Sequence, residues 1–302
     1  MKIAVLMSTY NGHKFLDKQL KSIAEQTLVD DLKLYIRDDG SSDDTFEIIE
    51  KWEEKIDIVL FKGKNVGPAK SFWILFMDDN IQADYYAFCD QDDIWDPDKI
   101  ERGVKAIDKE ENPALWCSNC RLINGDERLL KKLMMTKKPD LSITSQLVCG
   151  SVQGCAMVFN SKLRNYIVMK KPETFPMHDF VVLTYGIAIG KVIYDENPSF
   201  SYRLHENNVI AKEQKKFSVR KIESLKRWFS DEHKYEVSNF AKIFLKDNSK
   251  LIDSDTIEFI EDIINCKKKW KIRCKIIRSP LTSTQNKAAL RSFKMRVILG
   301  II

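Results

Sequence analysis

The feature of this 302-residue sequence that most restricts its fold is a repeated alternation of strand-like and helix-like segments. Apolar runs of strand length occupy residues 3–7, 32–36 and 58–61, and a fourth run begins at Tyr85. Segments with apolar residues at helical spacing separate these runs. Strands that alternate with helices are joined by crossover connections, which place neighbouring strands in parallel. The pattern therefore predicts an α/β fold with a mostly parallel sheet flanked by helices.

Polar loops follow three of the four predicted strands. They are STYN at residues 8–11, DDGSSDDT at residues 38–45 and DQDD at residues 90–93. In an open α/β sheet, ligands bind outside the carboxyl ends of the strands. We therefore expect the three loops to converge on one cleft.

The loop DQDD carries three closely spaced carboxylates, at Asp90, Asp92 and Asp93. Like charges at this spacing raise one another's pKa unless a cation joins them. Carboxylate oxygens are hard ligands suited to Mg²⁺ or Mn²⁺, which keep substrate phosphates among their other ligands. We predict that Asp90 and Asp92 bind such a metal and that Asp93 orients the loop. The simpler interpretation is an acidic turn that caps the following helix, since Asp is favoured at helix starts.

Composition and cysteine usage indicate a soluble globular protein of the cytoplasm. Hydrophobic residues make up 44% of the chain and charged residues 31%, which is ordinary for such proteins. The apolar run at the start reaches polar residues by Ser8, too soon for a signal peptide or a membrane-spanning helix. Seven scattered cysteines fit a reducing compartment, and we interpret the lone CxxC at residues 117–120 as structural thiols.

Charge is distributed unevenly along the chain. Residues 209–302 contain 22 Lys and Arg against 11 Asp and Glu, whereas residues 1–208 contain 27 against 33. From Ile263 onward there are 11 basic residues and no acidic one, interleaved with apolar residues at roughly helical spacing. This pattern favours a surface helix on anionic lipid, at the inner face of the cell membrane. A solvated helical face, homo-oligomerisation through the same apolar faces and a nucleic-acid patch are the alternatives, and the last lacks any nucleic-acid fold signature.

The motifs belong to a longer series that ends at residue 208. The series comprises STYN, DDGSSDDT, N-x-G at residues 65–67, DQDDIW-x-P-x-KI, GCAMVFN at residues 154–160, His178-Asp179 and YRLHENN. In order and spacing it resembles the family 2 glycosyltransferases with the GT-A fold. DQDDIW, the His-Asp pair and YRLHENN are similar to the bacterial rhamnosyltransferase-type members that build capsule or cell-wall polysaccharides. The resemblance implies a GT-A domain over residues 1–208, followed by a basic, helical C-terminal region over residues 209–302, with the boundary near residues 208–218.

The resemblance also implies an activity. The activity is the inverting, metal-dependent transfer of one sugar to a glycan or lipid-linked acceptor. The sugar donor would be linked to dTDP or UDP, and dTDP-L-rhamnose is one such donor. The chain lacks the Q-x-x-R-W signature of processive synthases, which argues against a polymer synthase.

Nucleotide-binding roles follow from the resemblance for five residues. Thr9, Tyr10 and Asn11 would lie under the nucleotide, with Tyr10 as a stacking face. Asp39 would accept a hydrogen bond from the imino N–H of uracil or thymine, as a charge-assisted acceptor does well. Lys70 would face the nucleotide or its phosphates, and an exposed helix lysine is the alternative.

Metal and catalytic roles follow in the same way. Asp90 and Asp92 would bind the Mn²⁺ or Mg²⁺ that bridges the diphosphate, with Asp90 also near the nucleotide, and His205 would complete the metal shell or contact a phosphate. Asp179 would be the general base that takes the proton of the acceptor hydroxyl. Its alternative role, which is compatible with the first, is to cap the helix that begins at Phe180.

Four further residues are assigned to the sugar or the acceptor. Gly154 and Cys155 would line the acceptor side, and His178 would set the loop or touch the sugar. Trp95 would be a stacking platform for the sugar, with a place in the buried core as the alternative.

Two other functions remain open from the sequence. A non-catalytic scaffold or binding subunit with the same fold would have no need for the acidic cluster. A nucleotidyltransferase should carry a phosphate loop rich in Lys and Arg near the start, where STYNGHKF offers little beyond Lys14.

Overall fold

The computed structural model describes residues 1–28, 31–205, 228–230 and 234–302. The chain forms two compact units, which are described separately. The first unit contains residues 1–138, 152–169 and 190–205, and the second contains residues 139–151, 170–189 and 206–302. Residues 139–151 and 170–189 therefore group with the C-terminal helices, whereas the sequence pattern divides the chain near residue 208. The boundary predicted at 208–218, and the helical positions Ile222 and Leu225, lie outside the described residues.

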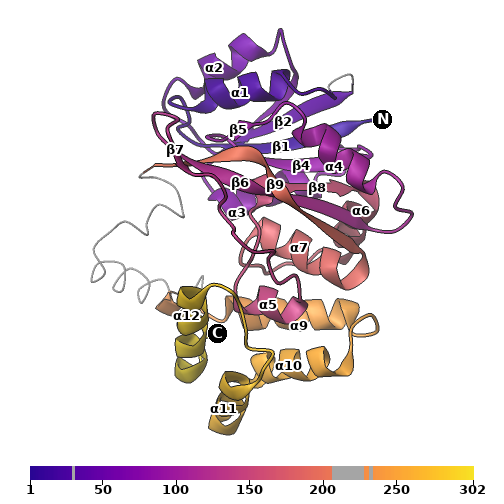
Figure 1. Ribbon diagram of the computed structural model, residues 1–302, viewed down its shortest axis with the longest axis vertical. Coiled ribbons are helices and arrows are strands. Elements are labelled where there is room, and N and C mark those ends of the chain that lie inside the picture. Colours follow the sequence, from indigo (N-terminus) through magenta and orange to yellow (C-terminus); the bar gives the residue numbers. More distant parts are fainter. Residues whose placement is uncertain (29–30, 206–227, 231–233) are drawn as a thin grey trace. The chain divides into compact units, whose positions relative to one another are not determined.

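Four parallel strands form the first half of the sheet in the first unit (Figure 1). They are β1 (Ile3–Thr9), β2 (Leu32–Asp38), β3 (Asp57–Lys62) and β4 (Tyr85–Asp90), in the order β3-β2-β1-β4. Thr9 pairs with Asp38 across β1 and β2, and Ser8 pairs with Asp90 across β1 and β4. The carboxyl ends of β1, β2 and β4 therefore lie at the same edge of the sheet.

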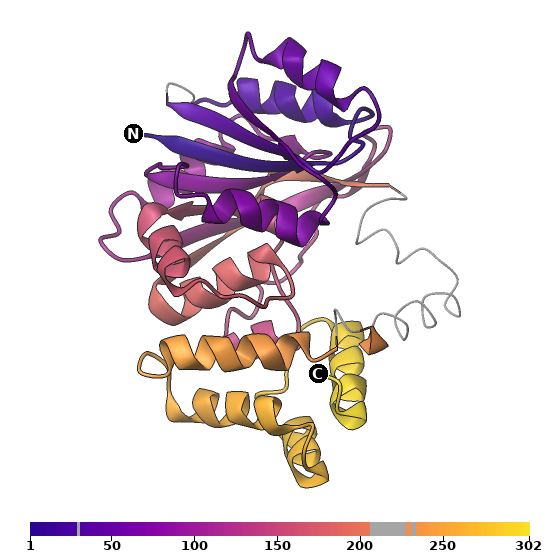
Figure 2. The same ribbon diagram turned by 180° about the vertical axis from the view of Figure 1, so that it is seen from behind.

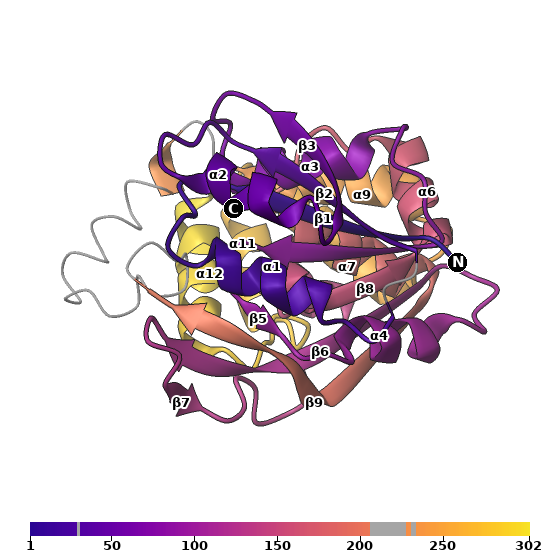
Figure 3. The ribbon, with the colours of Figure 1, turned by 90° about the horizontal axis from the view of Figure 1, so that it is seen from above.

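The helices between these strands cover both faces of the sheet. They are α1 (Leu16–Ala24), α2 (Thr45–Trp52) and α3 (Pro68–Met77). The helices α1 and α2 lie on one face, and α3 lies on the other, against β1 and β2 (Figures 1 and 3). The chain runs outward from β1 to β3 and then returns to place β4 on the other side of β1. Such a reversal creates a topological switch point between β1 and β4, where open α/β sheets bind ligands.

The second half of the sheet is mixed. It contains β5 (Ile94–Trp95), β6 (Ala114–Asn124), β7 (Leu129–Lys131), β8 (Met157–Asn160) and β9 (Lys191–Leu204). Strand β8 pairs antiparallel with β4 and with β6, while β6 and β9 run parallel and β5 pairs antiparallel with β9. The long ladders of the sheet are thus parallel, as predicted, and short antiparallel ladders of β5, β7 and β8 make the sheet mixed.

Strand β9 corrects one prediction. The sequence predicted two short strands at 191–194 and 199–203, because turn-forming residues separate them. The structure has one strand whose pairing with β6 shifts register, so that Ser118 pairs with Asp195 and Asn119 with Pro198. The extra residues of β9 form a bulge, which absorbs the proline without ending the strand.

Helix α4 (Lys99–Ile107) packs closely on β6 and β8. Gly103 permits this, because a Cβ built there would lie 2.6 Å from Val158 Cγ2 and 3.0 Å from the ring of Trp116. The remaining elements of this unit are the 3₁₀ turn Gly154–Ala156 and α6 (Ser161–Lys170).

The second unit is helical (Figure 2). Its helices are α5 (Ile143–Val148), α7 (His178–Ile189), α9 (Glu236–Asn248), α10 (Ser254–Asn265), α11 (Trp270–Arg278) and α12 (Lys287–Leu299). The aromatic rings of Phe180 and Tyr185 on α7 pack edge-to-face against Phe240 on α9. Helix α5 lies partly in a stretch that the sequence predicted to be irregular. No helix in the described part of the chain combines the length and the apolar character needed to cross a bilayer.

Candidate active site

Three loops meet at the carboxyl ends of β1, β2 and β4, as predicted. The amide side chain of Gln91 holds the backbone of Tyr10 on both sides, since Oε1 accepts from Tyr10 N at 2.9 Å and Nε2 donates to Tyr10 O at 3.1 Å. Asn11 adopts a left-handed φ of 48°. Its backbone N donates to Ser41 Oγ and its Oδ1 accepts from Ser42 N, both at 2.9 Å. The loops after β1, β2 and β4 are therefore one connected structure.

Asp38 fixes the shape of the second loop. Its Oδ1 accepts from the Thr9 hydroxyl at 3.0 Å, and its Oδ2 accepts from the backbone N of Gly40 at 3.0 Å and of Ser41 at 2.8 Å. The side chain of Asp38 is fully buried. The carboxylate of Asp38 therefore stabilises the loop and its connection to Thr9.

Asp39 is buried at 2% exposure and held by three donors. Arg37 Nη1 lies 2.5 Å from its Oδ1, Val66 N donates to both oxygens, and Gly67 N donates to Oδ2 at 2.9 Å. A carboxylate has about four lone-pair sites. Each oxygen of Asp39 already accepts two of these contacts, so Asp39 is held firmly at the start of the loop and ties it to residues 66 and 67.

Two buried arginines support the loops, and the sequence analysis missed both. Arg37 pairs with Asp39 and also donates to Ser71 Oγ at 3.0 Å. Arg203 is 0% exposed, and it donates from Nε to Asp92 O at 2.8 Å and from its backbone N to Asp93 Oδ1 at 3.2 Å. Arg203 lies within the motif YRLHENN, so the motif itself was the available signal.

The carboxylates of DQDD are not equivalent. Asp92 Oδ2 lies 2.6 Å from His205 Nε2, and these side chains are 13% and 17% exposed. Asp93 is fully buried, and its Oδ2 has no hydrogen-bond partner among the described residues. Burial raises the pKa of Asp93 well above its ordinary value, and the neighbouring Asp92 and Asp90 raise it further. Asp93 therefore favours the neutral acid, while Asp92 faces the histidine.

The potential ligand atoms at this site suit a hard divalent cation. Asp90, Asp93 and Cys155 bring one potential ligand atom each to within 4.8 Å of one another, next to the pair of Asp92 and His205. Carboxylate oxygens suit Mg²⁺ and Mn²⁺, and imidazole is accepted by transition metals. Burial raises the pKa of the Cys155 thiol well above its ordinary value, so Cys155 stays protonated. Among the described residues, the structure thus brings Asp90, Asp93 and Cys155 within coordinating distance of one another, and the predicted ligand set of Asp90, Asp92 and His205 stays a prediction.

The residues predicted to bind the sugar or the acceptor are buried. Trp95 is 3% exposed, Cys155 is 1% exposed and His178 is 4% exposed, and Gly154 is also buried. The burial of Trp95 fits the alternative interpretation, a place in the core. The sugar and acceptor roles of these four residues stay predictions.

Lys99 is a buried cation below this site. Its Nζ donates to Cys155 O at 2.8 Å and lies 4.9, 5.8 and 4.6 Å from the ring centres of Trp95, Trp116 and Phe200. Burial lowers the pKa of Lys99 to about 8. A lysine in a helix pattern is normally exposed, so periodicity does not predict its burial. Lys99 is the Lys of the motif DQDDIW-x-P-x-KI, so the motif was the available signal.

Tyr10 and Lys70 are accessible. Tyr10 is 48% exposed, and its ring is free to stack on a planar group. Lys70 is exposed in the first turn of α3. Both predictions for these residues, a nucleotide contact and an ordinary surface position, are compatible with this exposure.

Asp179 belongs to the second unit, in the first turn of α7. Its Oδ1 accepts from Phe180 N at 2.7 Å, which fixes the carboxylate at the start of the helix. Burial lowers the pKa of the adjacent His178 to about 4, so that imidazole is neutral. Asp179 and the acidic cluster lie in different units, and its role as the base stays a prediction.

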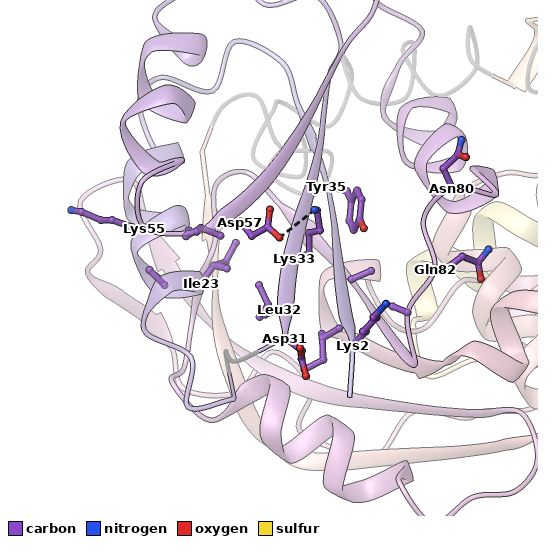
Figure 4. Close-up of a pocket in the computed structure, with 15 residues that line it drawn as sticks. Lys2, Ile23, Asp31, Leu32, Lys33, Tyr35, Lys55, Asp57, Asn80 and Gln82 are labelled. Carbon is purple, nitrogen blue, oxygen red and sulfur yellow. Dashed lines mark ion pairs between the residues drawn. The ribbon is translucent and has the colours of Figure 1, made fainter.

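A separate cavity of about 730 Å³ lies at the opposite edge of the sheet, at the amino ends of β1 and β2 (Figure 4). Its lining includes Lys2, Tyr35 and the ion pair of Lys33 with Asp57, whose charged atoms are 3.2 Å apart. Ligand sites of open α/β sheets lie at the carboxyl ends instead. This cavity is therefore not part of the candidate active site.

The sheet order, the switch point and the carboxylates at the strand ends define the GT-A glycosyltransferase fold. Residues 1–349 of TarS of S. aureus, solved in complex with UDP-GlcNAc, have this fold, with a TM-score of 0.59 at 14% identity, covering 99% of this chain and 89% of that solved chain. The mannosyltransferase PcManGT from Pyrobaculum calidifontis, solved in complex with GDP-Man and Mn²⁺, has a TM-score of 0.52 at 13% identity, covering 98% and 87%. The predicted fold class is confirmed.

The sequence comparison gives the family. The family model for glycosyl transferase family 2 matches residues 4–167. Because this match spans more than half of the chain, the protein belongs to glycosyl transferase family 2. The dTDP-rhamnosyl transferase RfbG of Shigella flexneri is 28% identical over 285 residues, covering 89% of this chain and 94% of RfbG. An uncharacterised glycosyltransferase of Rickettsia typhi is 21% identical, covering 86% and 78%.

Proposed function

We propose that this protein is an inverting, divalent-metal-dependent glycosyltransferase that moves one sugar from a nucleoside-diphosphate donor to a glycan or lipid-linked acceptor in cell-surface polysaccharide synthesis. The observation that carries the proposal is the acidic cluster at the switch point, where His205 lies 2.6 Å from Asp92. The first donor to consider is dTDP-L-rhamnose, since the similar protein RfbG is named a dTDP-rhamnosyl transferase and is matched over nearly its full length.

The nucleotide would bind across the loops after β1 and β2. The exposed ring of Tyr10 provides a stacking face for the base. Asp39, held by Arg37 and two backbone amides, would accept a hydrogen bond from the imino N–H of uracil or thymine. Thr9 and Asn11 shape the loop, and Lys70 is available to the phosphates.

The diphosphate would lie at the end of β4. Asp90, Asp92 and His205 would hold a Mn²⁺ or Mg²⁺ ion there, and the structure of PcManGT contains Mn²⁺. When bound, the ion would supply Lewis-acid stabilisation of the negative charge on the departing nucleoside diphosphate. Arg203 positions the backbone of Asp92 for this role.

The acceptor hydroxyl would lose its proton to Asp179. Inversion requires a base on the face of the sugar opposite the leaving group. The bond from Phe180 N orients the carboxylate of Asp179, and the neutral His178 beside it brings no competing charge at physiological pH. General-base catalysis then lowers the barrier for attack on the anomeric carbon.

Calorimetric titration tests the donor site. The UDP and dTDP series, with GDP as a control, are titrated with and without Mn²⁺ into the wild type, Asp92→Ala and Asp126→Ala, an exposed aspartate in the turn after β6. Metal-dependent binding of one pyrimidine series that Asp92→Ala abolishes and Asp126→Ala keeps is expected. No nucleotide binding under any metal condition would refute the proposal and favour a scaffold subunit with this fold.

A further inference from the structure

One surface of the second unit combines exposed lysines with exposed apolar side chains. We call it the KKKWK patch. It consists of Lys267, Lys268, Lys269, Trp270 and Lys271 before and at the start of α11, together with Ile298 and Leu299 at the end of α12. The exposed fractions are 59% for Trp270, 39% for Ile298 and 41% for Leu299. Large apolar side chains in an ordinary solvated face are seldom grouped in this way.

Arg273 joins the two halves of the patch. Its guanidinium and Nε donate to Cys266 O at 2.9 Å, to Lys267 O at 3.0 Å and to Ile298 O at 2.9 Å. Gly300, with a φ of 69°, lies against the guanidinium so closely that a Cβ there would be 2.3 Å from Nη2. The lysine run and the apolar end of α12 are thus held side by side as a built structure.

The charge of the patch is not neutralised within the described part of the chain. No carboxylate described there forms an ion pair with Lys267, Lys268, Lys269 or Lys271, and all four are exposed. The nearby Lys275 differs, because its Nζ lies 2.5 Å from Glu258 and 2.7 Å from Asp262. Among the described residues, Lys275 is therefore paired with carboxylates, and the four patch lysines are not. The ammonium of Lys267 lies 4.2 Å from the ring centre of Tyr235, a contact that leaves its charge in place.

We infer that the KKKWK patch docks the enzyme on an anionic lipid bilayer, with Trp270, Ile298 and Leu299 inserted at the headgroup level and the four lysines over the lipid charges. Tryptophan is favoured at the boundary between headgroups and acyl chains, because its ring is apolar and its N–H is polar. Each lysine near such a surface raises the partition coefficient roughly fivefold. Nucleic acid would use the lysines and leave the two aliphatic side chains exposed to water.

This inference deepens the proposed function, since it rests on an acceptor near the membrane. A docked patch would keep the enzyme where a lipid-linked acceptor is concentrated. Binding to lipid, however, needs neither donor nor acceptor. A vesicle experiment can therefore fail or succeed independently of sugar transfer.

Flotation of the full-length protein with vesicles tests the inference. The vesicles contain phosphatidylcholine alone or with about one-third phosphatidylglycerol. The wild type should float only with the anionic vesicles. Changing the four patch lysines to Gln should lower partitioning on the order of 600-fold, which is the product of four roughly fivefold effects. Trp270→Ala should lower partitioning roughly tenfold, and raising the salt concentration should not reproduce this loss.

A matched control variant loses the same number of positive charges at positions outside the patch. It carries Lys→Gln at Lys109, Lys242, Lys246 and Lys250, all exposed and outside the patch. This variant should retain at least roughly one-third of wild-type partitioning, because salt screens charges that lie far from the membrane surface. Equal losses in both variants would show a diffuse effect of net charge and refute the patch.

Three results would overturn the inference. They are no flotation of the wild type with anionic vesicles, unchanged flotation of Trp270→Ala, and salt-dependent binding to duplex DNA in place of vesicle binding. Circular dichroism and thermal unfolding of each variant check that the helices remain folded. The patch side chains are exposed, so these substitutions should change stability by no more than about 0.5 kcal/mol.

Discussion

Asp179 is the residue on which the proposed chemistry depends most directly. Replacement by Asn keeps the size of the side chain and the acceptor oxygen for Phe180 N, but it removes the base. We expect kcat to fall by about 10² to 10⁴, while the affinity for the donor measured by calorimetry stays close to that of the wild type. A variant with normal kcat would show that Asp179 serves only the first turn of α7.

Lys99 should make stability depend on pH. Its pKa is about 8 in the folded protein, well below that of an exposed lysine. Between pH 8 and 10.5 the unfolded chain binds more protons at this position, so this residue's contribution to folding stability rises with pH. The gain approaches on the order of 3 kcal/mol at the upper end of that range.

Comparison of the wild type with Lys99→Met tests this contribution. The buried cysteines, whose pKa values are raised, lower stability at high pH in both proteins. The charge of Lys99 lowers these cysteine pKa values, so the difference between the two proteins contains this coupling as well as the titration of Lys99 itself. In urea titrations at several pH values, the free energy of unfolding of the wild type should rise relative to that of the variant as the pH increases from 7.5 to 10.5. Lys109→Met, at an exposed position, is the control. A difference that does not change with pH would mean that Lys99 is not buried as a cation.

Single residues were predictable where their role depends on neighbours in the sequence. Asp90 and Asp92 stand in one short loop, and the crowding of their charges is enough to predict a cation. Gln91 and Arg203 were missed, because their partners lie far away in the sequence, as Tyr10 does for Gln91. Arg37 was missed although its partner Asp39 is only two residues away, because its burial depends on the tertiary fold. Trp95 was ambiguous for another reason, since an aromatic ring suits both a core and a sugar site.

Among the elements, α4 depends on the absence of a side chain at Gly103. A Cβ there would lie 2.6 Å from Val158 Cγ2. Overpacking costs about 1–3 kcal/mol, and the better helix propensity of Ala returns at most about 1 kcal/mol. We expect Gly103→Ala to lower the free energy of unfolding by about 1–2 kcal/mol in urea titrations.

Gly125→Ala is the matched control for that experiment. No heavy atom lies within 4 Å of a Cβ built at Gly125. Its stability should stay within about 0.5 kcal/mol of the wild type. If Gly103→Ala is equally neutral, α4 must be able to move away from the sheet without loss.

The elements were predicted best where one segment has one periodicity. The four strands from β1 to β4 and the helices between them occur as expected, because each apolar run is short and bounded by polar loops. Strand β9 was split in two because its bulge contains turn residues that normally end a strand. The antiparallel pairing of β8 with β4 and β6 could not be predicted, since pairing partners are chosen by tertiary packing.

For the whole molecule, the division into units predicts how the chain tolerates truncation. Phe180 and Tyr185 of α7 are packed against Phe240 of α9, and Tyr185 Oη donates to Asp247 at 2.7 Å. A fragment of residues 1–208 would keep α7 and lose α9. We expect this fragment to bind the dye ANS strongly and to precipitate at concentrations at which the full chain is soluble. A soluble fragment with cooperative unfolding would show that residues 1–208 fold alone.

The separation of α7 and α9 in the chain also matters during synthesis. Helix α7 ends at Ile189, and α9 ends at Asn248. At about 5–20 residues per second, the ribosome needs roughly 3–12 s to supply the partner that covers the aromatic face of α7. During that interval the nascent chain carries an uncovered apolar helix, which makes α7 a natural binding segment for a chaperone that meets emerging chains.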